Sequence, residues 1–211
     1  MRQSIGVLFL CVLCVIPCSR AGAILVNLND QERAEAIKQG GEQGTNVIKH
    51  VNQHYKFGKE DLYNESGILR TKWSKLMVIS GLMAGRSLIP TEQEQSMILG
   101  DSTLQVDVHV YGDRMDFANA YKVYLVQSAK QIEADKISAD DVAYSPPGGS
   151  GTTGFPKYRA TIRSYFDYEK IDPGAKTIVV LVKDNKKVIF EVNFADYKCC
   201  LLYTSDAADD R

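Results

Sequence analysis

The sequence predicts an α+β protein, with a helical N-terminal region followed by an antiparallel β-sandwich-like C-terminal domain. The main observation is a change of hydrophobic period near residue 100, from the spacing of helices to the alternation of strands. A second observation is that residues 24–198 contain no cysteine, so an exported domain of this length must be stabilised by its core rather than by disulfides. We therefore divide the chain into a signal peptide (1–23), a helical region (24–100), a β-sandwich-like domain (101–198) and a separate C-terminal stretch (199–211).

The first two helices are predicted from a capping pair and from apolar spacing. Asn29 stands three residues before Glu32, which is the pattern of a capping box, and the helix formers of DQERAEAIKQ follow. We expect Gly40-Gly41 to end this helix. A second helix is predicted by four apolar residues at helical spacing: Val47, Ile48, Val51 and Tyr55.

Two further helices are predicted before residue 100. One runs from about residue 70 to 86 and is expected to bury Trp73, Leu76, Met77 and Leu82. The last opens after Pro90, with Thr91 and Glu94 as a capping pair and Gly100 as its end.

From residue 102 onward the hydrophobic period is two. In STLQVDVHVYG, Leu104, Val106, Val108 and Val110 alternate with polar residues, which predicts a half-buried strand. Further strands are predicted at 120–127, 158–168, 176–183 and 187–194, with a turn at residues 172–174 and a hairpin at Asp184-Asn185. Five or six antiparallel strands in this stretch favour a β-sandwich, interrupted by a long loop at 138–154.

The first 23 residues have the order of a secretory signal peptide. Arg2 precedes an apolar run at residues 5–16, and Ala21-Gly22-Ala23 follows as a small-residue cleavage site. A membrane anchor needs roughly 18 apolar residues, more than this run provides. We expect cleavage after Ala23 and a periplasmic or extracellular protein without a transmembrane segment; acylation of Cys18 and a retained anchor are less favoured alternatives.

The C-terminal stretch CLLYTSDAADD resembles the translation of a transposase adapter used to prepare sequencing libraries. The resemblance covers Cys200 to Asp209 in order. It implies that the native sequence is interrupted near Cys199 and that the tail carries no biology. A disordered acidic tail is the alternative interpretation.

Charge and motifs exclude several functions. With 25 Lys and Arg against 26 Asp and Glu, the net charge of −1 provides no footprint for nucleic acid. The G-x-G-x-x-G pattern at 149–154 is flanked by prolines instead of a strand and a helix, so we expect no nucleotide there. We expect no cofactor.

Histidines and tyrosines supply the candidate site residues. His50 and His54 share one helical face and could be two metal ligands, although zinc chemistry needs a third protein ligand, and two solvated histidines are the favoured interpretation. Tyrosines on one open sheet face could stack on a sugar or contact a partner chain, although tyrosine is also an ordinary strand residue. The tyrosines concerned are Tyr111, Tyr121, Tyr124, Tyr158, Tyr165 and Tyr168.

Two runs, LGDSTLQVDVHVYGDRMDF and FPKYRATIRSYFDYEKIDPGAKTIVVLVKD, make residues 30–198 similar to exported bacterial proteins of unknown function. The resemblance implies a bacterial origin and export but no activity. By elimination we expect a non-enzymatic binding or assembly module of the cell envelope, whose partner is an unknown envelope protein or glycan. The alternatives are a metal-dependent hydrolase that uses His50 and His54, and a carbohydrate-binding module.

Overall fold

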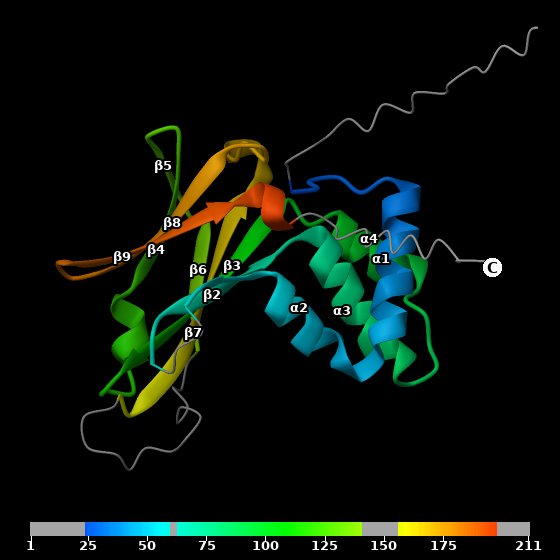
Figure 1. Cartoon of the computed structure of the whole chain (residues 1–211), viewed down its shortest axis with the longest axis horizontal. Coiled ribbons are helices and arrows are strands. Elements are labelled where there is room, and N and C mark those ends of the chain that lie inside the picture. Colours follow the sequence, from blue (N-terminus) through cyan, green and yellow to red (C-terminus); the bar gives the residue numbers. More distant parts are fainter. Residues whose placement is uncertain (1–23, 60–62, 141–155, 198–211) are drawn as a thin grey trace, which may run out of the picture.

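The computed structural model describes residues 24–59, 63–140 and 156–197. The predicted signal peptide, the adapter-like tail and the G-x-G-x-x-G pattern lie outside these residues. The fold is α+β, as predicted: a helical N-terminal region precedes a β-rich C-terminal part made of two antiparallel sheets (Figure 1).

Four α-helices lie within the described residues and gather at one end of the molecule (Figure 1). They are α1 (Asp30–Gln43), α2 (Val47–His54), α3 (Lys72–Ala84) and α4 (Glu92–Leu99). Short 3-10 helices are η1 (Gly44–Asn46), η2 (Phe117–Ala120), η3 (Tyr168–Lys170) and η4 (Phe194–Tyr197).

Both predicted capping boxes are present. The Asn29 side chain accepts a hydrogen bond from the Glu32 amide at 2.9 Å, and the Glu32 carboxylate accepts one from the Asn29 amide at 2.8 Å. Thr91 and Glu94 form the same reciprocal pair at the start of α4, which ends at Leu99 as the following glycine predicts. These side chains satisfy amides that the first helical turn leaves without partners.

The prediction that Gly40-Gly41 ends the first helix is wrong, because α1 continues to Gln43. Gly40 is buried where α1 crosses α3, and a Cβ atom there would lie 2.3 Å from the Met77 carbonyl oxygen. The glycine therefore allows close packing of two helices, and this role outweighs its low helix propensity.

The helices enclose a core of their own. Trp73, Leu76 and Met77 are buried as predicted, but Leu82 is 45% exposed because it lies on the side of α3 that faces away from this core. The core consists of Ala36, Val47, Val51, Tyr55, Ile68, Trp73, Leu76 and Met77.

The larger sheet has five described strands in the order β1-β2-β3-β7-β6. They are β1 (Lys56–Gly58), β2 (Ser66–Arg70), β3 (Thr103–Gly112), β7 (Tyr158–Asp167) and β6 (Lys136–Ala139). All neighbours pair antiparallel, and β3 and β7 form the longest ladder.

Two of these strands, β1 and β2, were missed by the sequence analysis, which assigned helices throughout that region. β1 has only three residues, and four of the five residues of β2 are buried, so neither strand shows the alternation that reveals a half-buried strand. Ile68 of β2 belongs to the helical core, whereas the next residue, Leu69, belongs to the core between the sheets. β2 therefore joins the helical part to the sandwich.

The smaller sheet has four described strands in the order β5-β4-β8-β9. They are β5 (Lys130–Glu133), β4 (Lys122–Gln127), β8 (Lys176–Lys183) and β9 (Lys186–Asn193). The predicted hairpin at Asp184-Asn185 joins β8 to β9, and Asp184 has φ of 52° at the turn. The described part of the C-terminal region holds seven strands, more than the five or six predicted. The strands β5 and β6 were not among the predicted ranges, because they are short and carry charged residues.

The two sheets pack face to face over the main hydrophobic core. Leu104, Val106, Val108 and Val110 of β3 are fully buried, which confirms the predicted orientation of this strand. Side chains of the other sheet meet them, and the Phe57 and Phe190 rings contact across the two sheets with centroids 5.2 Å apart. The smaller sheet contributes Val123, Leu125, Ile132, Val179, Leu181, Phe190 and Val192.

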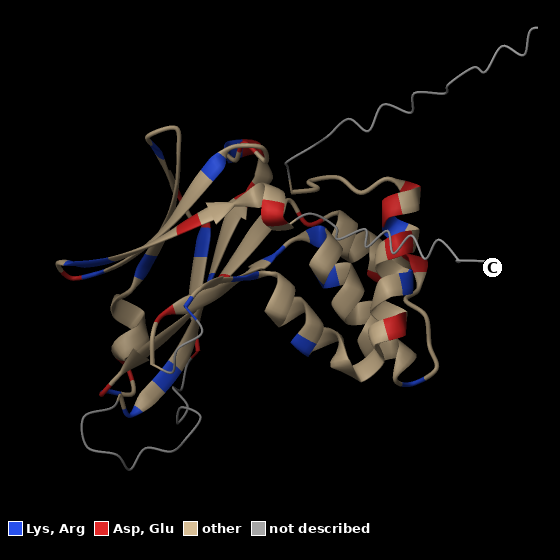
Figure 2. Ribbon diagram, in the orientation of Figure 1, with Lys and Arg blue, Asp and Glu red and all other residues tan. Residues whose placement is uncertain are grey.

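Charged residues lie mainly on the periphery of this architecture. Figure 2 shows acidic residues along α1 and basic residues at the tip of the β8–β9 hairpin. Among the described residues, no helix is both long enough and apolar enough to cross a membrane.

Replacement of Val108 by Asp tests the assignment of the sandwich core. Val108 is fully buried, so Val108→Asp places a charge without a partner between the sheets, at a cost of several kcal/mol. We expect the variant not to fold, or to melt far below the wild type, in thermal unfolding followed by circular dichroism. The control Ile189→Asp makes the same kind of change at a side chain that is 61% exposed and should melt close to the wild type. A stable Val108→Asp variant would contradict the core assignment.

Candidate functional site

The two candidate metal ligands, His50 and His54, lie on α2 with their ring centroids 4.1 Å apart. His54 Nδ1 is 2.9 Å from the His50 carbonyl oxygen, one helical turn earlier. Burial and the neighbouring His54 both lower the pKa of His50. Within the described ranges, no group of three or more His, Cys, Asp or Glu side chains is placed to hold a metal ion. The structure therefore brings the predicted pair together, but among the described residues it places no third metal-ligating side chain beside the two imidazoles.

The six candidate tyrosines do not share one face. Tyr111 and Tyr165 lie on the outer face of the five-stranded sheet, while Tyr158 packs at the edge of the sandwich core. Tyr121 lies under Lys183, and Tyr168 is only 6% exposed. Tyr124 alone of the six lies on the outer face of the four-stranded sheet.

That outer face carries a contiguous hydrophobic surface, which we call the apolar face. The register places Tyr124 opposite Val180, and Val180 opposite Ile189, in one row across three strands. Cross-strand partners point to the same side of a sheet, so their side chains are in contact. The apolar face consists of Tyr124, Val126, Ile178, Val180, Val182 and Ile189.

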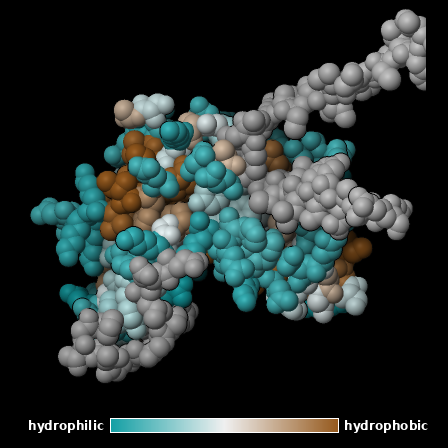
Figure 3. Space-filling model, viewed as in Figure 1, coloured by the Kyte–Doolittle hydropathy of each residue, from teal (hydrophilic) through white to brown (hydrophobic). Residues whose placement is uncertain are grey.

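The apolar face is open to solvent among the described residues. None of its six residues belongs to the sandwich core or the helical core, and Ile189 is 61% exposed while the other five are half-buried. Figure 3 shows hydrophobic residues gathered over the strands β4, β8 and β9. Charged residues of both signs surround the face: Lys122, Glu133, Lys187 and Glu191.

Sequence reasoning missed the apolar face, although a signal for it exists. The strand KTIVVLVK contains five successive apolar residues, 178–182, and the methyl group of Thr177 extends this run by one position. Such runs are typical of strands that are covered on both faces. Only the inward-facing residues, such as Val179 and Leu181, are covered by the other sheet. The sequence cannot tell which face of a strand its neighbours will cover.

A second feature is a polar network on the outer face of the five-stranded sheet. Arg70 Nε donates to Asp107 Oδ2 at 3.1 Å, and Arg70 Nη2 donates to Asn52 Oδ1 of α2 at 3.0 Å. Gln105 Nε2 donates to the other Asp107 carboxylate oxygen at 2.7 Å. Asp107 is only 6% exposed, so this network compensates a buried charge and fastens α2 to the sheet.

The network continues across β7 to the end of β6. Arg163 Nη1 donates to Asp140 Oδ1 at 2.7 Å, and the Thr161 amide donates to Asp140 Oδ2 at 2.8 Å. Burial alone would raise the pKa of Asp140, but the hydrogen bonds from Arg163 and Thr161 outweigh burial and lower it. Asp140 therefore remains an anion paired with Arg163.

His109 lies in the middle of this polar surface. Its Nδ1 atom is 3.2 Å from Thr161 Oγ1, and its cross-strand neighbours are Ser66 and Thr161. Burial and the nearby Arg159 lower the pKa of His109 to about 4, although Asp107 acts in the opposite direction. His109 is consequently neutral at neutral pH, and its hydrogen bond to Thr161 fits a structural role.

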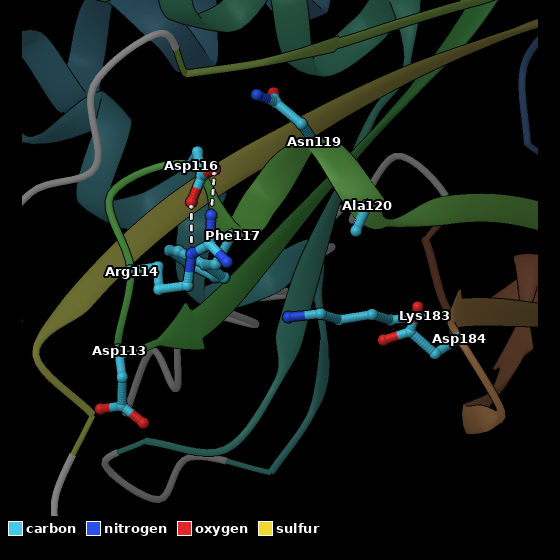
Figure 4. A pocket seen from close by; sticks show the side chains of 8 residues that line it. All are labelled: Asp113, Arg114, Asp116, Phe117, Asn119, Ala120, Lys183 and Asp184. Atoms are coloured by element: carbon cyan, nitrogen blue, oxygen red, sulfur yellow. Dashed lines mark hydrogen bonds and ion pairs between the residues drawn. The ribbon is translucent and has the colours of Figure 1, made fainter.

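An open depression of about 590 Å³ lies where η2 meets the β8–β9 hairpin (Figure 4). Arg114 donates two hydrogen bonds to Asp116, of 3.0 and 2.8 Å, and these hydrogen bonds lower the pKa of Asp116. Lys183 Nζ lies 4.9 Å from the Tyr121 ring centroid and 5.6 Å from that of Phe117. These contacts fasten η2 to the hairpin and leave Arg114, Asp116 and Lys183 with partners inside the chain.

Comparison with known proteins assigns no family to this arrangement. No protein-family model matches the chain, and no curated protein matches it. The functional interpretation therefore depends on the surfaces described above.

The lowered pKa of His109 predicts a specific pH dependence of stability. Between its ordinary pKa of 6.5 and the folded value of about 4, the unfolded chain binds a proton that the folded chain does not. The free energy of unfolding therefore falls as the pH falls through this window, by roughly 3 kcal/mol from this residue. We expect His109→Gln, which keeps a hydrogen-bonding side chain, to lose less stability than the wild type between pH 7 and pH 4.5 in urea unfolding.

The exposed His54 provides the matched control. His54→Gln should retain most of the wild-type pH dependence. An unchanged pH dependence in His109→Gln would show that His109 is not held neutral by the fold.

Proposed function

We propose that this protein is an exported, non-enzymatic binding or assembly module of the bacterial cell envelope, and that it contacts another protein through the apolar face. The observation that carries the proposal is a contiguous hydrophobic surface on the outer side of the four-stranded sheet. Contiguous exposed apolar surface is costly in water and marks interaction sites on soluble domains.

The composition of the apolar face favours a protein partner. It contains one aromatic ring, Tyr124, and five aliphatic side chains, which is the composition of a sheet-packing surface. An apolar centre with a polar rim is also the usual anatomy of a protein–protein interface. The rim carries both charge signs, with Lys122 and Lys187 against Glu133 and Glu191, so it offers no uniform field for a nucleic acid or an anionic membrane.

The polar surfaces support a binding role over a catalytic one. The charged groups of the network are joined to each other, Arg70 with Asp107 and Arg163 with Asp140, and both pairings link separate structural elements. Such pairing is what a fold needs to compensate partly buried charges. The apolar face, in contrast, has no such function within the described chain.

The proposed location follows from the N-terminal sequence. A positive charge, a twelve-residue apolar run at 5–16 and an A-x-A site at 21–23 are the successive parts of a secretory signal. Export to the periplasm or beyond is also compatible with a body, residues 24–198, that contains no cysteine and depends on its core.

Photo-crosslinking in a Gram-negative host tests this proposal. A photoreactive phenylalanine analogue replaces Ile189 or Tyr124 on the apolar face, and the control position is Ile48 on α2, which is 43% exposed. We expect the processed protein in the periplasmic fraction to form a discrete protein adduct from Ile189 and Tyr124 but not from Ile48. Absence of an adduct at both face positions, or equal labelling at Ile48, would contradict the proposal.

A further inference from the structure

We propose that the partner of the apolar face is a second copy of this chain, related by a two-fold axis that runs across the strands. This inference rests on the proposed function of the apolar face as a protein contact. It is carried by the way that the charges of the rim are placed around the hydrophobic centre.

Three rows of side chains define the face. The middle row contains Glu133, Tyr124, Val180 and Ile189 from four successive strands. The row on one side contains Lys122, Val182 and Lys187. The row on the other side contains Gln131, Val126, Ile178 and Glu191.

Two copies that pack face to face are related by a two-fold axis lying in the plane of their contact. When this axis follows the middle row, each outer row lies over the opposite outer row of the second copy. Lys187 then meets Glu191 of the other copy, and Val182 meets Ile178. The contact is isologous, so the Lys187–Glu191 pair forms twice.

Two further charged side chains, Lys122 and Glu133, have to be accommodated by this axis. Lys122 lies over Val126 of the second copy, where its aliphatic stem can cover the valine while its ammonium group reaches solvent. Tyr124, Val180 and Ile189 lie along the axis and meet the same row of the second copy, which produces a hydrophobic centre with two ion pairs at its β9 end. Glu133, at the β5 end of the row, meets Glu133 of the second copy at the edge of the contact, where both exposed carboxylates reach solvent.

The other simple arrangement, with the axis parallel to the strands, fits the charges less well. It places Glu133 over Ile189 of the second copy, which buries a carboxylate against an apolar side chain. It also places Lys187 beyond the end of β5, opposite no acidic residue of the three rows. Neither arrangement gives Glu133 a cationic partner, but only the axis across the strands forms the two Lys187–Glu191 pairs, and these pairs favour it.

The size of the face sets the strength of the association. Four strands about 4.8 Å apart and about 20 Å long give a sheet surface of roughly 400 Å² per copy. A contact of this size is at the lower end of specific interfaces, so we expect a reversible dimer with a dissociation constant in the micromolar range.

Sedimentation velocity over a concentration series tests the dimer with a charge-swap set. Lys187→Glu and Glu191→Lys each place like charges together twice, and each should weaken dimerisation by about tenfold or more. The double variant Lys187→Glu/Glu191→Lys restores opposite charges and should dimerise like the wild type. The control Lys130→Glu makes the same charge change at an exposed position outside the three rows and should leave the dimer unaffected.

Zero-length carbodiimide crosslinking provides the second measurement. Lys187 and Glu191 are four residues apart on one strand, about 13 Å along the chain, so a direct crosslink between them forms only between copies. We expect this crosslinked peptide in the dimer of the wild type.

A wild-type protein that stays monomeric up to about 1 mM would overturn the proposed dimer. A dimer unaffected by Lys187→Glu, or not restored by the double swap, would overturn it as well. If the photo-crosslinking from Ile189 then captures a different protein, the proposed function stands while the two-fold dimer fails. If neither Ile189 nor Tyr124 captures a protein, both fail.

Discussion

The structure depends on covering both faces of the central strand β3. On one side, Leu104, Val106, Val108 and Val110 fill the core between the sheets with no exposed surface. On the other side, the Asp107 carboxylate is nearly buried and takes hydrogen bonds from Arg70 and Gln105. Arg70 also binds Asn52, so a single guanidinium connects β2, β3 and α2. Removing one partner of such a buried pair costs about 3 kcal/mol or more, whereas the pair itself adds little net stability. The network therefore positions the helices more than it stabilises the sheets.

Much of the fold could be predicted from the sequence, because strong local signals decide those elements. The alternation of apolar and polar residues in β3 and β7 indicates strands with one buried face and one polar face. The capping boxes Asn29–Glu32 and Thr91–Glu94 identify two helix starts, because their side chains form the capping hydrogen bonds themselves. The local sequence patterns gave wrong predictions at positions where contacts between distant parts of the chain determine the secondary structure. The helix α1 continues past Gly40, because a residue without a side chain is what allows α3 to pack closely against it. The strand β2 shows no alternation of apolar and polar residues, because it is covered on both faces.

The candidate site was predictable only in part, for a related reason. The His50–His54 pair was expected to share a helical face, and the two rings do lie together. Tyr124 was expected as a contact residue among six tyrosines, but its hydrophobic surroundings come from β8 and β9, which are adjacent to it only after the sheet forms. A run such as IVVLV indicates an apolar strand, and only the packing of the two sheets determines that Val180 faces outward while Val179 faces the core.

The two sheets thus differ in how much of their outer faces is covered by other parts of the chain. Helices pack against β1 and β2 at one edge of the five-stranded sheet, and a polar network lies on its outer face, whereas the described chain leaves the apolar face of the four-stranded sheet open. The claim that this face is an association surface is tested most directly by methyl-resolved NMR of isoleucine- and valine-labelled protein over a dilution series. We predict concentration-dependent shifts at the methyl groups of Ile178, Val180 and Ile189, with the core methyl groups of Val108 and Val179 unchanged. Shifts at the outer-face methyl groups that stay constant from micromolar to millimolar concentration would contradict the claim of association between copies.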